Sequence, residues 1–176
     1  MVFQDTGLAG AWLIETEPSS DARGSFARTY CDREFGERGI AFRAVQCSTS
    51  MNSRRGTLRG IHMQVGDAAE EKLVRCTRGA IYDVIVDLRD ASPTRRKWFA
   101  AELTADNARM LYIPKGFGHG FMTLADGAEV FYQISQFYDP QAAQGVRWND
   151  PALAIRWPAG EPILSERDRG YPDLAR

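Results

Sequence analysis

The chain has 176 residues, 44% of them hydrophobic, so it is long enough to enclose one sizeable apolar core. Twenty-two basic and 23 acidic side chains leave a net charge of -1, which excludes a protein whose overall charge attracts nucleic acid or an anionic membrane. Three cysteines without CxxC spacing exclude a disulfide scaffold and a zinc knuckle. The length predicts one domain over residues 1–176. Because the sequence has neither a long apolar run nor a signal peptide, we expect it in the cytoplasm.

The predicted elements are many strands and two short helices. The first helix is expected in "DREFGERG", with Asp32 as its cap, and the second after "ILSERD" near the C-terminus. From about Arg43 to Tyr138, runs rich in β-branched and aromatic residues alternate with turn residues at a spacing typical of sandwiches and barrels. In chain order, the expected strands are "KLVRCT", "AIYDVIVDLRD", "KWFAAELT", "RMLYIP", "HGFMTL" and "EVFYQISQFY".

The clearest of these strands is "AIYDVIVDLRD". Its apolar residues at positions 82, 84, 86 and 88 fall on one face, and Asp83 and Asp87 fall on the other. The whole pattern predicts an all-β fold, a jelly-roll β-sandwich with short peripheral helices. An N-terminal arm and a C-terminal tail are expected to fold over it.

The chain has only two histidines, and both stand near glycines in expected strands: His62 in "GTLRGIHMQ" and His119 in "IPKGFGHGF". Each could be purely structural, yet histidine is also the natural base near neutral pH. A metal centre usually needs three or four His, Cys or carboxylate ligands, and the sequence has no His-x-His pair and no HExxH motif. We therefore predict proton transfer by side chains, without a metal or another cofactor.

An acid and several cations accompany the histidines. "EVFYQISQFY" offers Tyr132 and Tyr138, which period two places on one strand face, although aromatic residues favour strands for packing alone. Lys72 opens an apolar strand, either as an ammonium facing a pocket or as a solvated edge lysine. Arg23 and Arg59 each precede a glycine and suit phosphate oxygens. Since no P-loop or GxGxxG motif occurs, we expect arginines on a sheet to hold any diphosphate.

The order of these blocks resembles the dTDP-4-dehydrorhamnose 3,5-epimerases and related nucleotide-sugar epimerases. The similar blocks are "RGSF", "GTLRGIHMQ", "KLVRCTRGAIYDVIVDLR", "SPT", "YIPKGFGHGF", "EVFYQISQFY", "GVRWNDPALAIRWP" and "ILSERD". The resemblance implies a cupin-type jelly roll, an isomerase that uses no metal, and a nucleotide-diphosphate sugar as substrate. It also implies a homodimer in which N-terminal strands reach across to the partner.

The resemblance further implies roles for single residues. His62 matches the family's proton acceptor, Asp168 the carboxylate that pairs with it, and Tyr132 the proton donor. Lys72 matches the lysine beside the developing enolate. Among the substrate-binding positions, Arg59 resembles the diphosphate arginine and Arg23 a nucleotide-site arginine from the partner subunit; the others are Arg28, Gln46, Ser48, His119, Tyr138 and Arg167.

Some positions depart from the family pattern. Arg28 and Ala143 stand where glutamates are usual, Gln46-Cys47-Ser48 where Gln-Asp-Asn is usual, and Arg167 keeps the charge of a usual lysine. The proton-transfer residues are intact. The expected reaction is therefore inversion of C3, C5 or both in a nucleotide-diphospho-4-keto-6-deoxyhexose, through an enolate.

Three alternatives remain open. Because Arg28 reverses a charge near the expected base-binding region, the chain could be a mono-epimerase of a CDP-linked or other 4-keto sugar. It could be a 3,4-ketoisomerase on the same fold, which would need a different arrangement of acid and base. It could also be a non-catalytic cupin that binds sugar nucleotides, which would not need the His62 and Asp168 pair.

Overall fold

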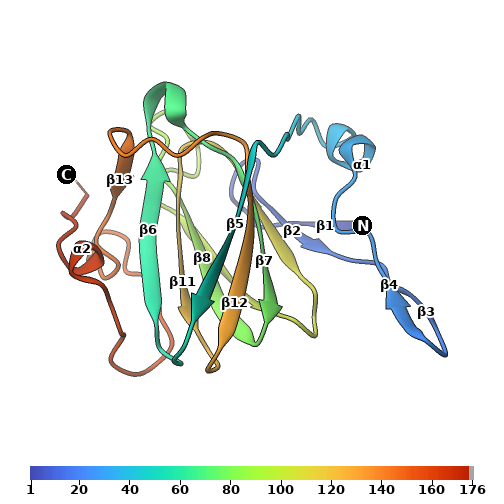
Figure 1. Ribbon diagram of the computed structural model, residues 1–176. Coiled ribbons are helices and arrows are strands. Elements are labelled where there is room, and N and C mark those ends of the chain that lie inside the picture. The colour runs from blue at the N-terminus through green and yellow to red at the C-terminus, as the bar shows by residue number, and fades with distance from the viewer. Residues whose placement is uncertain (175–176) are drawn as a thin grey trace.

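A computed structural model describes residues 1–174 as two facing antiparallel sheets (Figure 1). One sheet has six strands in the order β1 (Val2–Asp5), β2 (Trp12–Glu15), β10 (Met110–Ile113), β7 (Lys72–Arg78), β12 (Ala128–Ile134) and β5 (Gln46–Asn52). The other has five, in the order β13 (Ala143–Gly145), β6 (Leu58–Gln64), β11 (Phe117–Thr123), β8 (Ala80–Asp87) and β9 (Trp98–Thr104). The prediction of an all-β, cupin-type jelly roll is confirmed.

The remaining elements are short and peripheral. They are the hairpin β3 (Ser19–Asp21) and β4 (Gly24–Phe26), the helices α1 (Asp32–Gly36) and α2 (Glu166–Arg169), and the 3₁₀ turn η1 (Gly66–Ala68). Two expectations about the helices were wrong. The cap of α1 is Cys31, which is extended and makes no side-chain capping bond, and Asp32 is already the first helical residue. The second helix begins within "ILSERD", because the hydroxyl of Ser165 caps it by accepting a hydrogen bond from Asp168 N–H.

Apolar residues bury both faces of the central strands. On β8, Ile81 and Ile85 point into the core between the sheets, while Val84 and Val86 pack outward against the C-terminal segment that contains Leu153. A third cluster covers the outer face of the six-stranded sheet, with Phe35 and Phe42 from the segment around α1 packed on Tyr112 and its neighbours. A strand covered on both faces reads as a nearly continuous apolar run, as β8 does.

The tyrosine expected beside Tyr132 does not lie on its strand. β12 ends at Ile134, where its two neighbours begin at Gln46 and Lys72, so the chain beyond it has no long strand to pair with. Tyr138 therefore lies in the following loop, and the expectation that the two tyrosines share a strand face was wrong.

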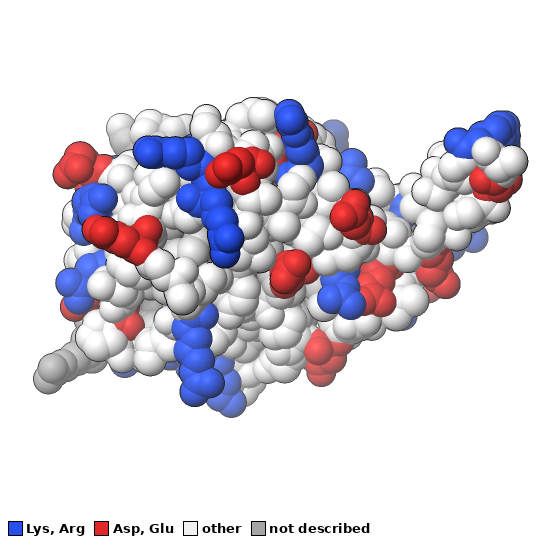
Figure 2. Space-filling model, turned by 90° about the horizontal axis from the view of Figure 1, so that it is seen from below, with Lys and Arg blue, Asp and Glu red and all other residues white. Residues whose placement is uncertain are grey.

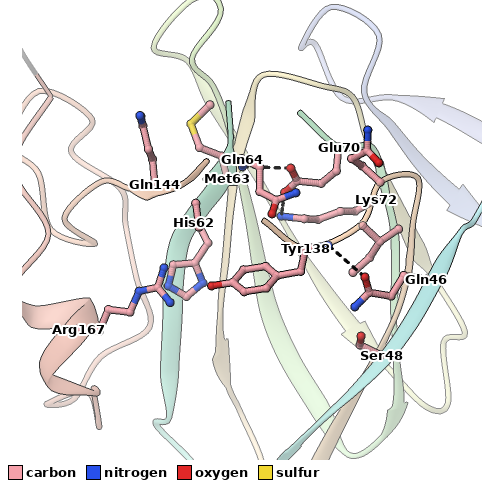
Figure 3. A pocket seen from close by; sticks show the side chains of 13 residues that line it. Gln46, Ser48, His62, Met63, Gln64, Glu70, Lys72, Tyr138, Gln144 and Arg167 are labelled. Carbon is pink, nitrogen blue, oxygen red and sulfur yellow. Dashed lines mark hydrogen bonds and ion pairs between the residues drawn. The ribbon is translucent and has the colours of Figure 1, made fainter. Parts of the chain in front are cut away.

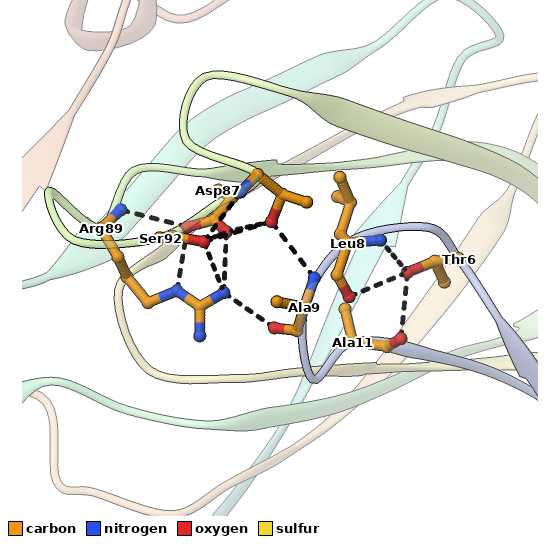
Figure 4. Close-up of polar contacts among 8 residues, drawn as sticks. Thr6, Leu8, Ala9, Ala11, Asp87, Arg89 and Ser92 are labelled. Carbon is orange, nitrogen blue, oxygen red and sulfur yellow. Dashed lines mark hydrogen bonds and ion pairs between the residues drawn. The ribbon is translucent and has the colours of Figure 1, made fainter.

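Asp87 anchors the loop that follows β8 (Figure 4). Its carboxylate accepts hydrogen bonds from Arg89 Nε at 2.9 Å, from Thr94 Oγ1 at 2.6 Å and from the Ser92 hydroxyl. Arg89 also donates to the carbonyl oxygen of Ala9 at 2.7 Å and so ties the N-terminal segment to this loop. Burial raises the pKa of Asp87, but the hydrogen bonds from Arg89, Ser92 and Thr94 outweigh it and lower the pKa to about 2.

We expect acid to destabilise the fold through Asp87. The folded pKa of about 2 lies below the unfolded value of about 4, so the carboxylate stabilises the protein above that unfolded value and loses this contribution as pH falls through the folded pKa. The lost contribution is about 2 kcal/mol. Urea unfolding of wild type and Asp87→Asn at pH 7 and pH 3 measures this contribution. The difference between the two proteins in the free energy of unfolding should be smaller at pH 3 than at pH 7. If this difference is the same at both pH values, the lowered pKa of Asp87 does not contribute to stability as expected.

Candidate active site

A cavity of about 340 Å³ opens between the two sheets (Figure 3). A second hollow, of about 290 Å³, shares Ser48, His62, Lys72 and Ile134 with it and extends toward His119 and Tyr132. The residues that line the larger cavity are Gln46, Ser48, His62, Met63, Gln64, Glu70, Lys72, Ile134, Gln136, Tyr138, Ala143, Gln144 and Arg167. The sequence-predicted acid, base and lysine thus meet in one connected space.

Glycines bring the strands that carry the two histidines close together. Gly60 has φ +123°, and a Cβ added to it would lie 2.5 Å from the Cα of Gly120 on β11. No other residue type fits such an approach without displacing backbone. In the resulting register, His62 on β6 is directly opposite His119 on β11, so both imidazoles lie on the same face of the sheet.

His62 forms a pair with a carboxylate from the C-terminal segment. Its Nε2 lies 2.5 Å from Oδ1 of Asp168, whose side chain is 6% exposed, whereas the His62 side chain is 40% exposed. Burial raises the pKa of Asp168, but the hydrogen bond with His62 opposes this and the net pKa is lowered. An ionised Asp168 accepts the Nε2 hydrogen, so Nδ1 is left as the basic nitrogen of His62.

Tyr132 faces this pair from the opposite sheet. It points inward from β12, packs on the central core, and its ring centre is 5.9 Å from that of His119. Burial is the largest cause that raises its pKa, the charge of Asp83 raises it further, and Arg59 acts in the other direction. The phenol therefore keeps its proton at neutral pH and can act as an acid.

Lys72 is held inside the cavity. Its Nζ is 2.8 Å from Oε1 of Glu70, and its side chain is only 12% exposed, which decides between the pocket ammonium and the solvated edge lysine. Glu70 is itself buried, and its other oxygen accepts the backbone N–H of Gln64 at 3.1 Å. The sequence reasoning missed Glu70, although an acidic residue two positions before a strand lysine was a visible signal.

The structure places the predicted substrate contacts in three locations. Gln46, Ser48, Tyr138 and Arg167 line the larger cavity, and Arg59 and His119 line the hollow behind it. Arg23 and Arg28 lie elsewhere. Arg23 is paired with Asp21 in the β3–β4 hairpin, which stands away from the body of the molecule (Figures 1 and 2), and Arg28 is paired with Glu34.

Within residues 1–174, no group of three or more His, Cys, Asp and Glu side chains is arranged to hold a metal ion. The cysteines Cys31, Cys47 and Cys76 are free thiols. None of the helices in the described part of the chain is long and apolar enough to cross a membrane.

Comparisons with known proteins agree with this geometry. A family model described as dTDP-4-dehydrorhamnose 3,5-epimerase matches residues 5–176. A curated protein of that name from Sinorhizobium fredii is 40% identical over 175 residues, which are 99% of this chain and 90% of that protein.

Solved structures are similar over nearly the whole chain. A dTDP-4-dehydrorhamnose 3,5-epimerase from Bacillus anthracis, with TDP and PPi bound, has a TM-score of 0.95 and 42% identity, with coverage of 98% of this chain and 99% of that one. ChmJ, a 3'-monoepimerase from Streptomyces bikiniensis in complex with dTDP-quinovose, has a TM-score of 0.88 and 35% identity, with coverage of 94% and 84%.

Proposed function

Because this chain belongs to the dTDP-4-dehydrorhamnose 3,5-epimerase family and is an isomerase, we propose that it inverts C3 and C5 of dTDP-4-dehydro-6-deoxyglucose. The observation that carries the proposal is the placement of His62 and Tyr132 on opposite sheets, with the cavity between them. Inversion requires that a proton leaves one face of a carbon and another arrives on the other face. A base on one wall and an acid on the other supply both.

His62 takes the proton from the carbon next to the 4-keto group. The ionised Asp168 fixes its ring and stabilises the imidazolium that forms. The electron pair left on carbon delocalises into the C4 oxygen as an enolate, and the Lys72 ammonium stabilises the charge that develops there. Tyr132 then gives its proton to the opposite face of the same carbon.

The nucleotide end of the substrate requires cations. Arg59 and Arg167 border the two hollows and suit the diphosphate, which a planar guanidinium can bind with two hydrogen bonds. Gln46, Ser48 and Tyr138 line the larger cavity and suit the sugar or the base. With Arg28 outside this cavity, the reversed charge at that position has no direct bearing on the nucleotide within one protomer.

We also propose that the chain folds as a single domain and forms a homodimer in the cytoplasm. The hairpin that carries Arg23 stands away from its own cavity, and Phe26, the last residue of β4, is 80% exposed. An exposed aromatic residue on a projecting strand is typical of an interaction surface. If the N-terminal strands of two subunits reach across to each other, Arg23 and Arg28 would reach the nucleotide that the other subunit binds. Sedimentation velocity that gives the 19.7 kDa monomer alone would contradict the dimer.

Proton NMR in D₂O tests the reaction. With dTDP-4-keto-6-deoxyglucose, we expect deuterium at both C3 and C5 and the inverted product, and neither with His62→Ala. Deuterium at only one carbon would reduce the proposal to a mono-epimerase, and faster turnover of the CDP-linked sugar would reassign the nucleotide. No exchange with either substrate would overturn it.

A further inference from the structure

Asp83 is a buried carboxylate that the proposed proton transfers leave unused. It lies in the middle of β8 with none of its surface exposed. Its Oδ2 accepts no hydrogen bond from any residue in the range 1–174. Burial of an incompletely paired carboxylate is costly, and an apolar residue would continue the inward row of Ile81 and Ile85. Such a group next to a reaction site points to a role in that site.

Among residues 1–174, the Asp83 carboxylate forms its hydrogen bond with His119. Nε2 of His119 lies 2.8 Å from Oδ1 of Asp83, and the two side chains are 5% and 0% exposed. His119 is the cross-strand neighbour of His62. The cavity therefore has two adjacent imidazoles, each held from behind by a carboxylate: His62 by Asp168 and His119 by Asp83.

The same carboxylate acts on Tyr132. The rings of His119 and Tyr132 meet nearly edge to face, with an interplanar angle of 74°. After burial, the charge of Asp83 is the largest contribution to the raised pKa of Tyr132, and Arg59 opposes it. The polar and charged groups around Tyr132 are Asp83 on β8, His119 on β11, Arg59 and His62 on β6, Lys72 on β7, and Ser48 and Ser50 on β5.

We propose that Asp83 is a positioning residue for the epimerisation, acting through His119 and Tyr132. By accepting the Nε2 hydrogen, it fixes the plane of the His119 ring and leaves Nδ1 as the nitrogen available to the substrate. Its negative charge also favours the neutral phenol of Tyr132, so that the proton donor is loaded before each turnover. This inference rests on the proposed function, because it assigns Tyr132 as the acid.

Nitrogen NMR of histidine-labelled protein tests the geometry without substrate. Since the chain has only two histidines, the ¹⁵N spectrum contains two imidazoles, and His62→Ala assigns them. At neutral pH, we expect His119 to carry its hydrogen on Nε2, in hydrogen bond to Asp83. A His119 whose hydrogen resides on Nδ1 alone would overturn the proposal, even if every Asp83 variant failed to fold.

Kinetics of Asp83→Asn test the function. We expect kcat to fall about 10- to 100-fold, as for the loss of a group that orients an active-site imidazole, with KM changed less than about threefold. Asp87→Asn is the matched control, because Asp87 lies on the same strand, is equally buried, and pairs with Arg89 away from the cavity. Its kcat should stay within about twofold of wild type.

A double-mutant cycle separates positioning from a general loss of stability. If Asp83 acts through His119, Asp83→Asn should cost much less in a His119→Asn background than in wild type. Unchanged kcat in Asp83→Asn, or an equal loss in Asp87→Asn, would overturn the inference while wild-type turnover still supported the epimerase. Inactive wild type with an intact Nε2 hydrogen on His119 would instead overturn the proposed reaction.

Discussion

Substitution of His62 by alanine should lower kcat by about 10²- to 10⁴-fold, the range expected for loss of a general base. His62 has a carboxylate partner at 2.5 Å and a side chain that is open to the cavity. Without it, the proton next to the 4-keto group has no acceptor on that face, and exchange at C3 and C5 should stop together. Deuterium incorporation from D₂O, followed by proton NMR, measures both carbons in one experiment.

Rescue by added imidazole provides the control for this substitution. The alanine variant leaves a gap beside Asp168, and because that part of the cavity is open, exogenous imidazole can enter it. We expect it to restore part of the exchange, and dTDP to bind the variant as it binds wild type. Exchange that persists in the alanine variant at more than a tenth of the wild-type rate would assign the base elsewhere.

Substitution of Tyr132 by phenylalanine should separate exchange from inversion. The substitution removes only the hydroxyl, so His62 can still abstract a proton and return one from solvent to the same face. We expect deuterium to appear at the sugar carbons with retained configuration, while formation of the inverted product falls about 10²- to 10⁴-fold. Proton NMR distinguishes the two outcomes, because the chemical shifts of the protons that do not exchange, at C1, C2 and the C6 methyl group, differ between the epimers.

Tyr82→Phe is the matched control for this substitution. Tyr82 lies on the outer face of the five-stranded sheet and packs on Trp157, with ring centres 6.2 Å apart, on the side away from the cavity. Its variant should invert the substrate as fast as wild type. If Tyr132→Phe lost exchange and inversion in equal measure, the hydroxyl would have to assist proton removal, and its assignment as the opposite-face donor would be wrong.

Alternation along the strands predicted β7 to β12, because the side-chain period of a strand is read directly from sequence, but it did not identify β2 or β5. It did not predict which face of β8 is inside. Asp83 and Asp87 point inward with the isoleucines, since each carboxylate has a partner elsewhere in the chain, in His119 and in Arg89. The Asp83–His119 pair depends on the register between β8 and β11, which strand periodicity alone does not supply, whereas Arg89 is only two residues from Asp87.

The limits of the site prediction have a similar cause. Lys72 was identified from its place at the head of an apolar strand, but the buried Glu70 that holds it was not, because its partner Gln64 lies on another strand. The alternation of side chains extended the predicted strand to Tyr138, but β12 ends at Ile134, where its neighbouring strands begin. The projecting hairpin that carries Arg23 is formed by local pairing of β3 with β4, and strand periodicity does not predict that it stands away from the cavity.

The pair of His62 and Asp168 joins the sheet to a segment 106 positions away. Asp168 belongs to a four-residue helix outside the sandwich, which packs on β6 and whose flanking residues are held by backbone hydrogen bonds from Leu58 N–H to Ile163 O and from Arg147 N–H to Pro172 O. Elements of this kind open locally at a lower free energy than a central sheet. If Asp168 acts as proposed, catalysis depends on a peripheral segment, and on heating we expect activity to be lost at a lower temperature than the β-sheet structure.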